Sequence, residues 1–184
     1  MDPFFIRAIV LGAALLSGAC AAACSDGLPT SPSLPQSSRT FLSLVSLPGD
    51  GVGNGFSQYA EKGDAEFVAT RSTLLSDRQS MQVVIRSTTT PQWSWVIYFQ
   101  VPQGQSLRAG AFENAMGYPA SAGRPGLMID GSRYRCLRPT GRFDVKELEF
   151  GTANSIPRLR VSFDVTCDNA TVPFRGEIGI VPGA

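Results

Sequence analysis

Hydrophobic and polar residues alternate along much of the chain after residue 40. The clearest example is RLRVSFDVTC, residues 158–167, in which apolar side chains occupy every second position and the last of them is Cys167. Successive side chains of an extended strand point to opposite faces, so this pattern predicts a strand with one buried and one solvated face. We expect Cys167 on the buried face.

A second alternating segment lies upstream, and its phase slips by one residue. Phe143 and Val145 follow one phase, whereas Leu148 and Phe150 follow the other. Such a slip is typical of a β-bulge, which inserts one extra residue into a strand. We therefore expect a bulge near Lys146.

Other segments predict further strands separated by turn residues. Residues 92–101, QWSWVIYFQV, are apolar on both faces, which is typical of a central strand. The stretch after residue 106 is ambiguous, because Phe112 suggests a short strand while residues 111–115 also fit a helical turn. The remaining strand predictions are 40–48, 65–71, 80–87, 126–130 and 173–181.

The spacing of these segments predicts an all-β fold. About eight or nine short strands, without helical periodicity over ten or more residues, favour an antiparallel β-sandwich of jelly-roll or Ig-like type. With 184 residues the chain is long enough for one such domain. We expect it to span residues 40–184.

The N-terminal residues have the layout of an export signal. Arg7 precedes the apolar run AIVLGAALL, which is too short for a permanent membrane helix. The signal resembles that of a bacterial lipoprotein, with Cys24 as the preferred lipidated residue and Cys20 as the alternative; a plain signal peptide also fits. We expect a signal over residues 1–24 and a flexible Ser/Pro-rich tether over residues 25–39.

The cysteine count supports Cys24 as the processed residue. Processing there leaves Cys136 and Cys167 as a pair, whereas processing at Cys20 leaves Cys24 as a spare thiol. We therefore expect a disulfide between Cys136 and Cys167, within one sheet or between two, in an oxidising compartment.

Composition excludes several function classes. The chain has no histidine, which removes Ser-His-Asp and Cys-His catalysis and histidine-ligated metal sites. A glycosidase-type carboxylate pair remains the catalytic option, although no spacing of acidic residues singles out a pair. The net charge of +1 gives no field that would attract nucleic acid. We expect neither an enzyme nor a nucleic-acid partner.

The C-terminal half contains GLMIDG, Cys136, TGRF and a strand of the form F-x-V-x-C, followed by a closing strand with glycine. In this order, over about residues 90–181, the chain resembles secreted bacterial β-sandwich domains of unknown function. The resemblance implies fold and compartment, and it transfers no catalytic motif.

A basic segment is the first candidate site. Guanidinium groups bind carboxylate, sulfate or phosphate in paired hydrogen bonds, so a patch for acidic glycan or lipid headgroups is one interpretation. The other is that these side chains pair with Glu147, Glu149 and Asp164 on neighbouring strands. The candidate patch consists of Arg124, Arg133, Tyr134, Arg135, Arg138 and Arg142.

The glycine-rich loop at residues 49–55 is the second candidate. Asp50, Asn54 and Asp64 offer oxygen ligands for calcium, and turn chemistry is the alternative explanation for the first two. No other cofactor is expected.

Aromatic side chains are the third candidate. Tyr59, Tyr118 and Tyr134 fall in predicted loops, where exposed rings can stack on sugars, whereas Trp93 and Trp95 are expected in the core.

These features predict an exported, lipid-anchored, non-enzymatic binding or adhesion module of the bacterial envelope, for glycan or anionic polymer. The alternative is a structural accessory subunit of an envelope assembly, and a glycosidase-type enzyme is the third possibility. The expected partners are the membrane, through the lipid, and a glycan or envelope protein.

Overall fold

The computed structural model describes residues 38–72, 79–136 and 138–183. The chain divides into two units, Met1–Leu34 and Pro35–Ala184, and the described residues all belong to the second. The predicted signal, both candidate lipidation cysteines and nearly all of the predicted tether lie outside the described residues.

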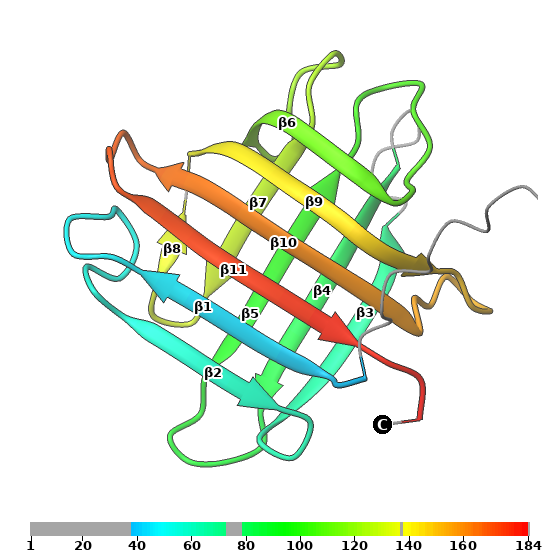
Figure 1. The fold of residues 1–184 in the computed structure, drawn as a ribbon, viewed down its shortest axis with the longest axis horizontal. Helices are drawn as coiled ribbons and strands as arrows, with labels where there is room; N and C mark the ends of the chain where they lie inside the picture. Colours follow the sequence, from blue (N-terminus) through cyan, green and yellow to red (C-terminus); the bar gives the residue numbers. More distant parts are fainter. Residues whose placement is uncertain (1–37, 73–78, 137, 184) are drawn as a thin grey trace, which may run out of the picture. The chain divides into compact units, whose positions relative to one another are not determined.

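The described part of the chain contains eleven β-strands and no helix (Figure 1). Their bounds are β1 Phe41–Ser46, β2 Ser57–Glu61, β3 Ala65–Ser72, β4 Ser80–Ser87, β5 Ser94–Gln100, β6 Gly110–Gly117, β7 Gly126–Gly131, β8 Arg135–Cys136, β9 Pro139–Glu149, β10 Arg158–Cys167 and β11 Pro173–Ile180.

The strands form one hydrogen-bonded sheet. Its order is β2-β1-β11-β10-β9-β6-β7-β5-β4-β3, and β8 pairs with β7. Among the described strands the pairs are antiparallel except β6 with β7, which run parallel over two residue pairs, Met116 with Gly126 and Gly117 with Leu127. The sheet is therefore mixed.

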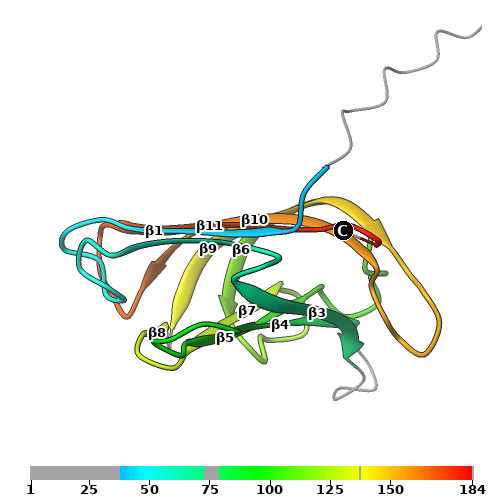
Figure 2. The same ribbon diagram turned by 90° about the horizontal axis from the view of Figure 1, so that it is seen from below.

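The sheet curls into nearly a barrel, with two facing layers. Figure 2 shows β1, β9, β10 and β11 in one layer and β3, β4, β5 and β7 in the other. In Figure 1 the strands of the two layers run in different directions across each other. The predicted all-β class is confirmed, but the sheet has eleven strands instead of eight or nine and is not purely antiparallel.

The core fills the space between the layers. In β10 every second side chain from Leu159 to Cys167 is buried, as the alternation predicts. Phe99 of the second layer meets Phe143 of the first edge to face, with ring centroids 5.2 Å apart. Aromatic pairs of this geometry add to the gain from burying their apolar area.

The predicted bulge in β9 is confirmed. Arg160 pairs with Glu147 and Val161 pairs with Val145, so Lys146 is the extra residue. The extra residue restores the correct face for Leu148, which packs against the core.

The ambiguous stretch after residue 106 is a strand, so the helical turn considered for residues 111–115 is wrong. β6 pairs with β9, with an irregular register between Phe112 and Ala115. Asn114 in this irregular region has a φ of 57°, outside the extended range. The local break in alternation explains why the sequence pattern was ambiguous.

The predicted disulfide between Cys136 and Cys167 is confirmed, with a Cα–Cα distance of 5.3 Å. Cys136 lies in β8, which pairs with β7, whereas Cys167 ends β10. The bond therefore links two strands that lie far apart in the order of the sheet.

Candidate functional site

Two arginines of the candidate patch form ion pairs with nearby carboxylates. Arg135 donates from Nε to Oδ1 of Asp130 at 2.8 Å and from a terminal nitrogen to Oδ2 at 3.3 Å. Arg142 lies 3.6 Å from a carboxylate oxygen of Glu113. Their charges are therefore compensated within the chain.

The other arginines have different surroundings. Arg124 contacts the sulfur of Met116 at 3.3 Å. Arg138 is exposed, and its backbone carbonyl accepts a hydrogen bond from the amide of Asp168. Arg133 lines a pocket with several aromatic side chains. The five arginines thus have different surroundings, and Arg133 lies in the pocket with Phe56, Trp93 and Tyr134.

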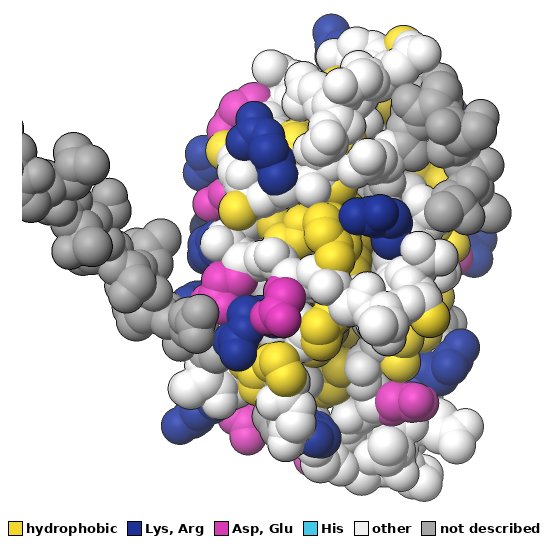
Figure 3. All heavy atoms as spheres, turned by 90° about the vertical axis from the view of Figure 1, so that its right-hand side faces the viewer, with side chains coloured by type: hydrophobic (Ala, Val, Ile, Leu, Met, Phe, Trp, Pro, Cys, Tyr) yellow, Lys and Arg dark blue, Asp and Glu magenta, His cyan; other side chains and the backbone are white. Residues whose placement is uncertain are grey.

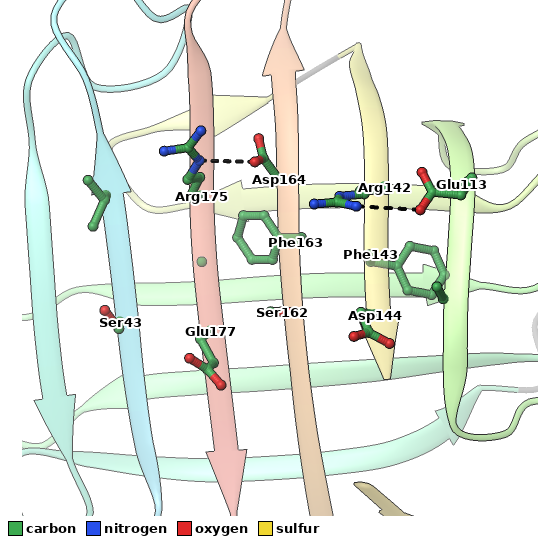
Figure 4. Close-up of a pocket in the computed structure, with 13 residues that line it drawn as sticks. Ser43, Glu113, Arg142, Phe143, Asp144, Ser162, Phe163, Asp164, Arg175 and Glu177 are labelled. Atoms are coloured by element: carbon green, nitrogen blue, oxygen red, sulfur yellow. Dashed lines mark hydrogen bonds and ion pairs between the residues drawn. The ribbon is translucent and has the colours of Figure 1, made fainter. Parts of the chain in front are cut away.

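A second hollow, of about 380 Å³, lies on the outer face of β1, β11, β10, β9 and β6 (Figure 4). Arg175 pairs with Asp164 at 3.0 Å, next to the pair of Arg142 and Glu113. Opposite charges alternate across these strands, which is typical of a solvated sheet face.

Glu177 on the same face pairs with two basic side chains. It accepts hydrogen bonds from Lys146 at 3.1 Å and from Arg160 at 2.9 Å. Burial alone would raise the pKa of Glu177, but these two cations outweigh burial and keep the pKa below its ordinary value. The carboxylate is therefore ionised and engaged, which is a structural role.

The glycine-rich loop is organised by Asp50. Its Oδ1 accepts backbone hydrogen bonds from Val52 at 2.8 Å, Gly53 at 2.9 Å and Asn54 at 3.1 Å. Asp64 instead accepts one from the amide of Glu61 at 3.2 Å. These contacts are those of turn residues.

The calcium site stays a prediction. Within the residues that the structure describes, no three acidic or cysteine side chains converge as metal ligands. Thermal unfolding with and without a chelator is the measurement that decides between calcium and turn chemistry.

One exposed face carries hydrophobic side chains among charged ones (Figure 3). Phe150, in the connection between β9 and β10, is 41% exposed. The guanidinium of Arg71 lies over its ring, 4.1 Å from the centroid. A cation–π contact thus covers this ring.

An aromatic pocket of about 270 Å³ is the strongest candidate site. Three connections supply its rings: Phe56 from β1–β2, Trp93 from β4–β5 and Tyr134 from β7–β8. Trp95 of β5 is buried and also lines the pocket. Ligand pockets are typically concave, rich in aromatic side chains and equipped with a few polar groups.

The rings form a packed cluster. The centroids of Phe56 and Tyr134 lie 4.5 Å apart, and Trp95 lies 6.3 Å from Phe56 and 6.5 Å from Tyr134. Gly131 leaves room for the Trp95 ring, because a Cβ there would come within 2.6 Å of it. The pocket walls are thus fixed by packing.

Polar contacts hold the same walls. The indole Nε1 of Trp95 donates to Oε1 of Gln58 in β2 at 2.9 Å. The amide of Ser94 donates to Oγ of Ser132 at 3.2 Å, and the amide of Ser132 donates to the carbonyl of Ser94 at 3.0 Å. The first residue of β5 is therefore joined to the β7–β8 connection at the pocket.

The aromatic predictions have mixed outcomes. Trp95 is a core residue, as expected, but Trp93 is half-buried and lines the pocket. Tyr134 lies in a loop, as expected, whereas Tyr59 lies in strand β2 and is 60% exposed. Tyr118 lies between β6 and β7, and its ring stacks on Tyr98.

Sequence reasoning missed Phe56, Gln58 and Ser132 as pocket residues. Phe56 follows the glycine-rich loop directly, and an aromatic residue beside such a loop was the one available signal.

No helix among the described residues is long and apolar enough to cross a membrane. Comparison of the chain with family models, curated proteins and solved structures gave no match.

Proposed function

We propose that this protein is an exported, lipid-anchored, non-enzymatic binding module of the bacterial envelope that holds a sugar ring in the aromatic pocket. Export and anchoring are supported by the N-terminal sequence, with Cys24 as the lipidated residue. The disulfide supports the same compartment, because such bonds persist in oxidising surroundings.

The aromatic pocket is the single observation that carries the binding function. Trp93, Phe56 and Tyr134 offer ring faces and edges on which the apolar face of a sugar can stack. Gln58, Ser132 and Arg133 stand beside these rings and supply hydrogen bonds to hydroxyl groups. Apolar walls with a few placed polar groups are what a sugar ring requires, because it has both kinds of surface.

The sandwich assignment is part of the proposal. Two facing layers over one core would act as a rigid scaffold, and the connections at one end would carry the ligand, as is general for binding sites on loops. Three carboxylates of the outer face, those of Glu177, Asp164 and Glu113, already pair with basic side chains, which supports a non-enzymatic function.

Intrinsic fluorescence tests this function, because both tryptophans of the chain line the pocket. Neutral and acidic oligosaccharides titrated into the full-length protein are expected to change the tryptophan emission in a saturable way. Trp93→Ala should weaken binding at least tenfold, since aromatic residues at the centre of a site carry much of the binding free energy. Calorimetry measures the loss of affinity in Trp93→Ala, because it does not depend on tryptophan emission.

Tyr59→Ala is the matched control. Tyr59 is 60% exposed and is not among the residues that line the pocket, so its removal should leave the affinity unchanged. Equal losses in both variants, or no binding of any oligosaccharide by the wild-type protein, would reject the proposed function and favour the accessory-subunit alternative.

A further inference from the structure

Arg133 gives the aromatic pocket an uncompensated positive charge. It is the only charged side chain among the described residues that line the pocket. No ion pair links it to a carboxylate within the described part of the chain, whereas Arg135 and Arg142 of the same segment each have one. A ligand that enters the pocket therefore meets a guanidinium group whose charge is not neutralised by a neighbour.

The amide of Gln58 adds a second hydrogen-bond donor. An indole N–H can only donate, so the amide must turn its oxygen toward Trp95. This leaves the NH₂ group of Gln58, which has no partner among the described residues, for a ligand. The hydrogen bond from Trp95 thus determines that Gln58 presents a donor to the pocket.

Ser132 adds a third donor by the same reasoning. Its Oγ already accepts a hydrogen bond from the backbone amide of Ser94 at 3.2 Å. The hydroxyl proton stays available to donate. Arg133, Gln58 and Ser132 therefore all present donors beside the aromatic rings.

We propose that the pocket selects a sugar ring that carries a carboxylate, as in a uronic acid. A carboxylate is a pure acceptor, and its two oxygens match the paired N–H groups of a guanidinium. The ring would stack on the aromatic wall formed by Trp93 and Tyr134 while Arg133 pairs with the carboxylate. This inference rests on the proposed function and adds the chemical class of the ligand.

Three probes of one size test the inference on the full-length protein: tri-galacturonic acid, its methyl ester and the neutral galactose trisaccharide. The acid is expected to bind at least tenfold more tightly than the ester, because hydrogen bonds to a charged group are stronger than those to a neutral one. Higher ionic strength should reduce the difference in affinity between the acid and the ester, since the ion pair between Arg133 and the carboxylate is partly exposed to solvent.

Arg133→Gln should bring the affinity for the acid down to that for the ester, because glutamine keeps a hydrogen-bond donor at this position but loses the charge. Arg133→Lys should keep part of the preference, because it retains the charge but loses the paired geometry. Arg138→Gln is the control, since Arg138 is an exposed arginine of the same segment that does not line the pocket.

The outcomes separate this inference from the proposed function. Equal affinities of the wild-type protein for all three probes would overturn the carboxylate selection and leave the sugar pocket standing. A preference for the acid that survives in Arg133→Gln would overturn the assignment to Arg133. No binding of any probe, also by calorimetry, would overturn both.

Discussion

At the scale of single residues, a buried carboxylate holds the glycine-rich loop in place. Asp50 is 8% exposed and its Oδ1 accepts three backbone hydrogen bonds. Such a group satisfies several amides that would otherwise lack partners in a loop without regular structure. The loop is therefore shaped by one side chain.

Asp50→Asn is expected to destabilise the protein at neutral pH by roughly 1 to 2 kcal/mol, because hydrogen bonds to an ionised acceptor are the stronger ones. Burial alone would raise the pKa of Asp50, but the Ser46 hydroxyl and the backbone amides outweigh it, so the pKa lies below its ordinary value. The folded state thus holds this proton less tightly than the unfolded state.

The sign of the pH dependence follows from that shift. The contribution of Asp50 to stability is present above the pKa of the unfolded chain, about 4, and is lost as the pH falls through the folded-state pKa. Thermal unfolding at several pH values should therefore show a difference between wild type and Asp50→Asn at pH 7 that shrinks below pH 4. A difference that is constant with pH would contradict this assignment.

At the scale of strands, alternation predicted the elements in which it is unbroken. β10 was predictable because its burial follows a strict period of two, and the bulge at Lys146 was predictable because it shifts the phase of a long pattern. β2 has one buried residue, Ala60, so its pattern is too weak to read. β6 is interrupted at Asn114, whose φ of 57° breaks the alternation.

The pocket was less predictable than the strands that support it. Trp93 and Tyr134 attracted attention separately, but only the pairing of β5 with β7 brings their connections together. Gln58 reaches the site from β2. In the strand order β2 lies at one end, whereas β5 lies near the opposite end. Long-range pairing of this kind leaves no periodic signal in the sequence.

Close packing between strands makes a specific prediction for β11. A Cβ at Gly176 would clash with the ring of Phe163 and come within 2.8 Å of Leu44. Gly176→Ala should lower the free energy of unfolding by about 1 to 3 kcal/mol through overpacking. Urea unfolding measures this loss.

Gly63→Ala is the control for Gly176→Ala, because nothing lies within 4 Å of a Cβ at residue 63. Its stability should stay close to that of the wild-type protein. Equal effects of the two substitutions would mean that backbone flexibility, and not the contact with Phe163, sets the cost.

At the scale of the folded unit, the disulfide joins strands that the sheet order separates. Cys136 lies in β8, which pairs with β7, whereas Cys167 ends β10. In the order of the sheet, β9 and β6 lie between β10 and β7. Replacing both cysteines by serine should destabilise the protein by roughly 3 to 4 kcal/mol, since the bond closes a loop of about thirty residues in the unfolded chain. Urea unfolding of the oxidised protein and the double variant tests this value.

The position of Gly51 connects the disulfide-bonded end of β10 with the aromatic pocket. A side chain at Gly51 would collide with the carbonyl oxygen of Cys167, so the glycine-rich loop rests directly on the cystine end of β10. The same loop leads into Phe56, one wall of the pocket. We therefore expect that reduction of the disulfide loosens the support of Phe56 and lowers the affinity of the proposed sugar site.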